Sequence, residues 1–191
     1  MGDSDKKERV LKTALTLFAE KGYEKTTVEE IALKSEIAKG TVYLYYPSKD
    51  AINNEVIRSA SEVRRKYIQS TGAGLEEDIR RTLAKLIMSE LRFARAEKRL
   101  YRLLMSNERN DEGAFSENNR SLRRGFLVEL TDLIQQGMAR GVIREGNPTL
   151  LGQLLNGMVR GSYQMLEENS SITVDQVVLS ILDLVWRGWT P

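Results

Sequence analysis

The side chains best able to do chemistry in this sequence fall close together, between residues 39 and 49. The side-chain hydrogen-bond donors of this segment include those of Lys39, Thr41, Tyr43, Tyr45 and Lys49. Ammonium and hydroxyl groups of this kind suit contacts with phosphate oxygens and base edges. Gly40 lies among them and has no side chain to keep the backbone away from a partner. The pattern favours nucleic-acid binding over catalysis.

Composition excludes most enzyme classes. The chain of 191 residues has no cysteine and no histidine, which removes disulfides, thiolate nucleophiles, imidazole bases and almost every zinc site. A helical carboxylate-metal enzyme would pair glutamate with histidine, so it is excluded as well. We therefore expect a protein that is not an enzyme, with no catalytic residue, no metal site and no cofactor.

Charge and hydropathy limit the other partners. The 29 basic and 27 acidic residues leave a net charge of +2, so any nucleic-acid site must be a local feature. No apolar run approaches the roughly 18 residues of a membrane helix, and the N-terminus lacks the apolar region of a signal peptide. We expect a cytoplasmic protein with no membrane partner.

The elements that position the donors are helices. Three prolines and abundant Leu, Ala, Glu, Lys and Arg predict an all-α fold of about nine helices. A first helix should run from about Asp5 to Gly22, and Thr26 or Thr27 should cap a short second one. A third should start near Ala38 and end before a proline, and a longer connecting helix should follow.

Further along the chain, the sequence also predicts where helices start and where they are interrupted. The small residues 70–74 predict a joint, and the polar stretch 106–119 predicts a loop. Asn147, followed by proline, is typical of a helix start. Thr173 and Gln176 form a capping-box pattern that predicts the start of the last helix.

Residues 27–51, TVEEIALKSEIAKGTVYLYYPSKDA, resemble the DNA-binding segment of the TetR family. The resemblance covers a helix, a tight turn, a short helix with an aromatic pair, and the proline, serine and lysine that follow. It implies a three-helix helix-turn-helix domain at 1–50 and a helical ligand-binding and dimerisation domain at 51–191. It also implies DNA contacts from Thr27, Lys39, Gly40, Thr41, Tyr43, Tyr45 and Lys49.

Three residues of this segment carry a local energetic cost. Glu36 stands where the family commonly has glycine, so it should adopt positive φ at about 1 kcal/mol. Ala38 replaces a small capping residue, and losing that cap costs a further ~1 kcal/mol. Lys49, in the first turn of its helix, opposes the helix dipole, so it should have a compensating partner.

The function implied is a repressor that binds a near-palindromic operator in double-stranded DNA as a homodimer and is released by a small, largely apolar ligand. The alternative is a helix-turn-helix repressor or assembly platform that needs no ligand. Candidate ligand contacts on the middle helices are Leu86, Glu90, Phe93, Tyr101, Met105, Phe126, Leu130, Asn156, Met158 and Arg160. Candidate dimer contacts on the last two helices are Leu151, Gly152, Leu155, Val178, Ile181 and Val185.

Overall fold

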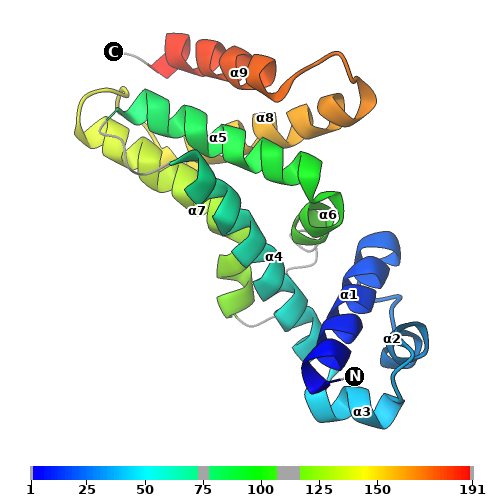
Figure 1. Cartoon of the computed structure of the whole chain (residues 1–191). Coiled ribbons are helices and arrows are strands. Elements are labelled where there is room, and N and C mark those ends of the chain that lie inside the picture. The colour runs from blue at the N-terminus through cyan, green and yellow to red at the C-terminus, as the bar shows by residue number, and fades with distance from the viewer. Residues whose placement is uncertain (1, 73–77, 107–116, 190–191) are drawn as a thin grey trace. The chain divides into compact units, whose positions relative to one another are not determined.

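The computed structural model describes residues 2–72, 78–106 and 117–189, and over these ranges the chain forms nine helices and no strand (Figure 1). The all-α prediction is confirmed. In chain order the helices are α1 Asp3–Lys21, α2 Val28–Ser35, α3 Lys39–Tyr45, α4 Lys49–Thr71, α5 Ile79–Ala96, α6 Lys98–Ser106, α7 Glu117–Ala139, α8 Pro148–Glu168 and α9 Val174–Trp189. The joint expected at 70–74 and the loop expected at 106–119 lie largely outside the described residues.

Several helix starts follow their local signals. Asn147 accepts a hydrogen bond from the Leu150 backbone at 3.1 Å, as expected of the residue before an N-terminal proline. The capping box at the start of α9 is also confirmed, since Thr173 and Gln176 accept from each other's backbone N–H groups. The first helix starts earlier than predicted, with Gly2 as its N-cap rather than Asp5.

The described chain packs as two compact units. Unit 1 comprises residues 1–62 and 98–123, and unit 2 comprises residues 63–97 and 124–191. In this division α4 continues in unit 1 through residue 62, and α6 packs against α1. The domain boundary expected at residue 50 stays a prediction.

Each unit has its own apolar core. In unit 1, α1 packs against α2, α3 and α6, and Phe18, Ile31 and Val42 are almost completely buried. In unit 2, α5 packs on α8 and α9, with Ile87 and Leu155 at full burial. None of the helices in the described ranges has an apolar stretch long enough to span a membrane.

Candidate nucleic-acid interface

The turn between α2 and α3 is held in a left-handed conformation. Glu36 has φ 55° and ψ 36°, and among the described residues it is the only non-glycine residue with positive φ. The Ile37 N–H then donates to the carbonyl of Ala32 at 3.0 Å, which closes the C-terminal end of α2. The positive φ predicted for Glu36 is confirmed.

An arginine of α1, which sequence reasoning missed, braces this turn. Nη2 of Arg9 donates to the Ser35 carbonyl at 2.6 Å and to the Glu36 carboxylate at 2.7 Å. The side chain of Glu36 is therefore tied to α1, and the strained turn has a tertiary support. No local pattern could have indicated this contact, because Arg9 and Glu36 lie 27 residues apart.

The start of α3 is open, as predicted. Ala38 supplies no side-chain cap, and its carbonyl accepts from the N–H of Thr41 at 2.8 Å and of Val42 at 3.0 Å. A Cβ added to Gly40 would have no heavy atom within 4 Å. Gly40 therefore has no packing role in the DNA-free chain, and its backbone is accessible to a partner.

The exposed donors of α3 are held by acidic side chains of unit 1. Lys39 forms an ion pair with Glu29, and its Nζ lies 5.8 Å from the centroid of the Tyr43 ring. The bond with Glu29 raises the pKa of Lys39, and the same bond lowers the pKa of Glu29. Leu44, next to Tyr43, is 83% exposed on this helix and was not a sequence candidate.

Tyr45 also has a partner on α1. Its hydroxyl donates to the carboxylate of Asp3 at 2.8 Å, and this bond raises the pKa of the Tyr45 hydroxyl. The ammonium of Lys7 lies 5.4 Å from the same ring. Because all these groups are exposed or half-exposed, a phosphate can replace the carboxylate without burying any of them.

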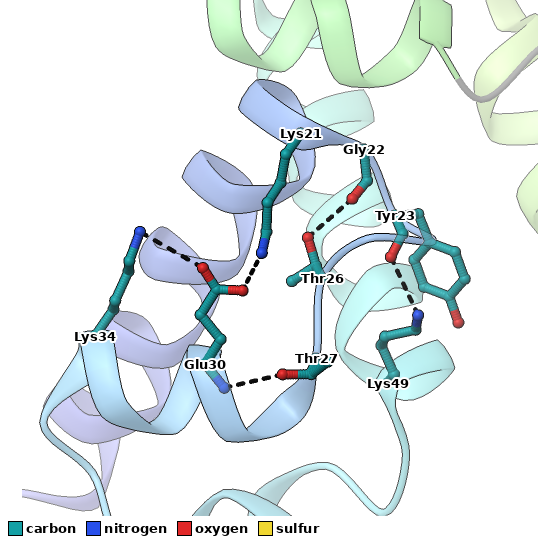
Figure 2. A network of polar contacts seen from close by, with 8 residues as sticks. All are labelled: Lys21, Gly22, Tyr23, Thr26, Thr27, Glu30, Lys34 and Lys49. Atoms are coloured by element: carbon teal, nitrogen blue, oxygen red, sulfur yellow. Dashed lines mark hydrogen bonds and ion pairs between the residues drawn. The ribbon is translucent and has the colours of Figure 1, made fainter.

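Lys49 has the compensating partner that its place in the helix requires. Figure 2 shows its Nζ reaching the backbone carbonyl of Tyr23 at 3.1 Å, and the ammonium lies 4.1 Å from the centroid of the Tyr23 ring. The Tyr23 hydroxyl donates in turn to Asp50. Burial, reinforced by this bond, raises the pKa of Tyr23.

Thr27, rather than Thr26, caps α2. The Thr27 hydroxyl oxygen accepts from the Glu30 backbone N–H at 3.2 Å, whereas Thr26 is buried and donates to the Gly22 carbonyl at 2.8 Å (Figure 2). The Glu30 carboxylate pairs with Lys21 of α1 and lies 3.6 Å from Lys34. These contacts fix the first helix of the pair against α1.

Two short helices joined by a tight turn define a helix-turn-helix DNA-binding protein, and the second of them carries an exposed lysine, an exposed tyrosine and a half-buried threonine. Residues 10–56 match the family model of bacterial regulatory proteins, tetR family. Residues 76–189 match the model of the Tetracyclin repressor-like C-terminal domain. The chain belongs to the TetR family of transcriptional regulators, which is not a family of enzymes.

Relatives of known name agree with this family. The chain is 27% identical over 186 residues to the uncharacterized HTH-type transcriptional regulator YerO of Bacillus subtilis, covering 93% of this chain and 61% of YerO. It is 28% identical to the HTH-type transcriptional repressor KstR2 of Rhodococcus jostii, and the match covers 98% of this chain and 92% of KstR2. It is 25% identical to the fatty acid metabolism regulator protein of B. subtilis, and the match covers 94% of this chain and 93% of that regulator.

A solved structure shares the fold. The regulator FadR from B. subtilis, in complex with stearoyl-CoA, superposes with a TM-score of 0.68 at 21% identity, covering 95% of this chain and 98% of that one. The chain therefore has the fold of this regulator.

The candidate ligand residues fall in both units. Tyr101 and Met105 lie on α6 in unit 1, whereas the others lie in unit 2. Those buried in unit 2 are Leu86, Glu90, Phe93, Phe126 and Leu130, and those half-buried are Asn156, Met158 and Arg160.

Glu90 has a partner that sequence reasoning missed. Nε of Arg64, on α4, lies 4.0 Å from Glu90, and Nη2 of the same guanidinium lies 3.9 Å from Glu129 of α7. Arg64 is a buried residue on the amphipathic connecting helix. An arginine on the apolar face of a helix could have drawn attention to it, because arginine is rarely buried without a partner.

The candidate dimer residues face the core of their own chain. Leu155, Val178, Ile181 and Val185 are buried in the apolar cluster of unit 2, and Leu151 is half-buried against it. A Cβ added to Gly152 would lie 2.6 Å from Oγ1 of Thr131. Within the single chain these side chains pack mainly inward, and their part in a dimer stays a prediction.

The exposed apolar side chains of α8 form a stripe of their own. Leu150, Leu154 and Met165 are more than half exposed, and Gly157 and Gly161, between Leu154 and Met165, have no atom within 4 Å of an added Cβ. The stripe comprises Leu150, Leu154, Gly157, Gly161 and Met165, spaced three or four residues apart. Leu179 and Leu184 are exposed on α9.

Proposed function

We propose that this chain is a repressor that binds a near-palindromic operator as a homodimer and leaves it when a largely apolar ligand binds. The observation that carries the DNA-binding part is the exposed face of α3. There Thr41 offers a methyl and a hydroxyl, Tyr43 and Lys39 offer donors, and Gly40 leaves the backbone open. A recognition helix in the major groove uses these groups to read bases and bind phosphates.

Dimerisation is proposed through the exposed stripe of α8 together with Leu179 and Leu184 of α9. Exposed leucines at helical spacing with glycines between them allow two helices to approach closely and to bury apolar area. A two-fold dimer of this kind would present two recognition helices, which accounts for the near-palindromic operator.

For the ligand we propose an acyl compound carried as a thioester. The regulators of similar fold include a fatty acid metabolism regulator and a protein in complex with stearoyl-CoA. Unit 2 also has a groove of about 420 Å³ lined by Tyr67, Arg92, Arg95 and the start of α9. Two arginines beside an aromatic ring suit the phosphates and the base of a nucleotide carrier.

Operator selection from random double-stranded DNA, followed by anisotropy titration with lauroyl-CoA, tests the proposal. We expect an inverted repeat, and we expect the DNA to be released as the thioester is added. Thr41→Ala should weaken operator binding about tenfold, as expected for loss of a base contact. An operator complex that no acyl compound releases would favour the ligand-independent repressor or platform.

The dimer is tested separately by sedimentation. Leu154→Glu places a charge in the stripe of α8 and should yield monomers. Leu33→Glu, at an exposed leucine of α2, is the matched control and should leave the dimer intact. Equal sedimentation of both variants as dimers would place the interface elsewhere.

A further inference from the structure

We infer that Arg64 and Glu129 form a recognition site in unit 2 for an uncharged polar group of the ligand, an amide or a hydroxyl, and not for a carboxylate. The inference rests on the proposed function, since it assigns the polar part of the acyl ligand proposed there. It goes further by naming the residues and the chemical class that they select.

The guanidinium of Arg64 is buried, and some of its N–H groups have no hydrogen-bond acceptor. Arg64 is 5% exposed, and its Nε and Nη1 make no hydrogen bond. The carboxylates of Glu90 and Glu129 lie at 4.0 Å and 3.9 Å, beyond the roughly 2.7–2.9 Å of a charge-assisted hydrogen bond. Oε2 of Glu129 also lacks a hydrogen-bond partner. One buried donor group and one acceptor group are therefore available together.

The chain makes room for this arrangement. A Cβ at Gly125 of α7 would lie 2.3 Å from Nη2 of Arg64, so only glycine leaves space for the guanidinium in its present position. Glycine within a helix costs about 1 kcal/mol relative to alanine. The present position of the Arg64 guanidinium therefore depends on glycine at residue 125, and a larger residue there would displace it.

The charges of the site select against an anion. Two carboxylates, Glu90 and Glu129, face one guanidinium, and Asp132 adds a further negative charge near Glu129. With every carboxyl group ionised, Arg64, Glu90, Glu129 and Asp132 together carry a net charge of −2, and protonation of Glu129 still leaves −1. A carboxylate entering the site would lose its hydration without meeting a net positive charge. An amide or hydroxyl can accept from Arg64 and donate to Glu129.

The surroundings of the site suit an apolar chain. One helical turn beyond Arg64 and Glu90, the rings of Tyr67 and Phe93 meet edge to face with centroids 5.7 Å apart. One turn before Glu129, Phe126 is buried in the core of unit 2. An acyl group on a pantetheine carrier presents an apolar chain followed by amides, whereas a free fatty acid ends its chain in a carboxylate.

The test compares two probes with the same twelve-carbon chain, lauroylpantetheine and laurate, by titration calorimetry on the full chain at pH 7. The unmodified chain should prefer lauroylpantetheine. Arg64→Gln should weaken lauroylpantetheine binding about tenfold, as for loss of a buried hydrogen-bond donor, and leave laurate binding unchanged. Arg65→Gln, at the exposed neighbour on α4, is the matched control and should change neither.

Glu129→Gln provides an independent test, because it should increase a binding affinity where Arg64→Gln should decrease one. Removing a negative charge should strengthen laurate binding by about threefold or more, which a purely structural role of Glu129 does not predict. This measurement also serves if Arg64→Gln does not fold. Preference for laurate in the unmodified chain, or unchanged binding of both probes by the two variants, would overturn the inference alone. Binding of neither probe by the unmodified chain would overturn the acyl ligand of the proposed function as well.

Discussion

In unit 1 the charged groups of the helix-turn-helix have close partners at the surface, whereas in unit 2 a buried guanidinium has only distant ones. Lys39 is paired with Glu29, and Lys49 donates to the Tyr23 carbonyl at 3.1 Å. Arg64, by contrast, approaches its carboxylates no closer than 3.9 Å. The contacts of Lys39 and Lys49 are therefore close, and those of the buried Arg64 are longer than hydrogen bonds.

The difference in burial determines what each set can do. Water replaces a lost partner at the surface, so a surface pair contributes little to stability and can be exchanged for a phosphate. A buried group has no such replacement, and removing its partner is costly. We therefore expect changes in unit 1 to act mainly on DNA binding, and changes at Arg64 to act on stability and ligand selection.

The largest expected effect is at the buried site. Arg64→Met should lower the free energy of unfolding by about 2 kcal/mol at pH 7, because it removes the buried guanidinium that faces the carboxylates of Glu90 and Glu129. Arg65→Met, one residue along α4 and exposed, should change it by less than about 0.5 kcal/mol. Urea unfolding of the two variants measures the contrast.

The pH dependence of this variant follows from Glu129. Burial raises the pKa of its carboxyl in the folded chain, so its ionisation opposes folding above that pKa and has no cost below the pKa of the unfolded chain. The difference in free energy of unfolding between the unmodified chain and Arg64→Met should therefore become smaller as the pH falls. If this difference instead became larger at low pH, the carboxylates would not be the cause of the lower stability.

The next effect separates DNA binding from stability. Gly40→Ala should weaken operator binding about tenfold, because a methyl group would keep the backbone of α3 from the duplex. It should not destabilise the free chain and should stabilise it by up to about 0.5 kcal/mol, since alanine favours helix and a Cβ meets no atom within 4 Å. Anisotropy and urea unfolding give the two quantities. Unchanged operator affinity would remove Gly40 from the interface.

The sequence predicted what depends on neighbours along the chain. The caps at Asn147 and Thr173, the open start at Ala38 and the positive φ of Glu36 each follow from a few adjacent residues and are observed. Even the need for a partner at Lys49 was predictable from its place in the first turn of α4. Its identity as the Tyr23 carbonyl was not, because that contact spans 26 residues.

Contacts between helices were the part that could not be predicted. Arg9 reaches the turn at Glu36, and Asp3 reaches Tyr45, without any local pattern. On α8 the apolar residues occupy two faces, and hydropathy does not distinguish the face of the core, with Leu155, from the exposed one, with Leu154. The buried Arg64 depends on Gly125 of another helix, a pairing that a single sequence does not reveal.

A third, smaller effect concerns the strained turn. Glu36→Gly should raise the free energy of unfolding by about 1 kcal/mol, because glycine adopts positive φ without steric cost. Glu36→Ala is the matched control, since it removes the same contact with Arg9 but keeps a Cβ at the strained position. Urea unfolding should place the alanine variant at or below the unmodified chain. Equal stability of the glycine and alanine variants would show that the conformation of Glu36 stores no strain.

The smallest effect is expected where a surface pair competes with DNA. Glu29→Gln frees Lys39 and removes a negative charge beside the recognition helix, so operator affinity should rise about threefold at low salt, with a change in stability below about 0.5 kcal/mol. Glu24→Gln removes an exposed charge outside the helix pair and is the control. The gain should shrink as salt is added, because the effect is that of a screened surface charge. A loss of operator affinity in Glu29→Gln would mean that Glu29 positions Lys39 for DNA and does not compete with DNA for this lysine. The surface ion pair of Lys39 in unit 1 would then have a positioning role, as the buried contacts of Arg64 have in unit 2.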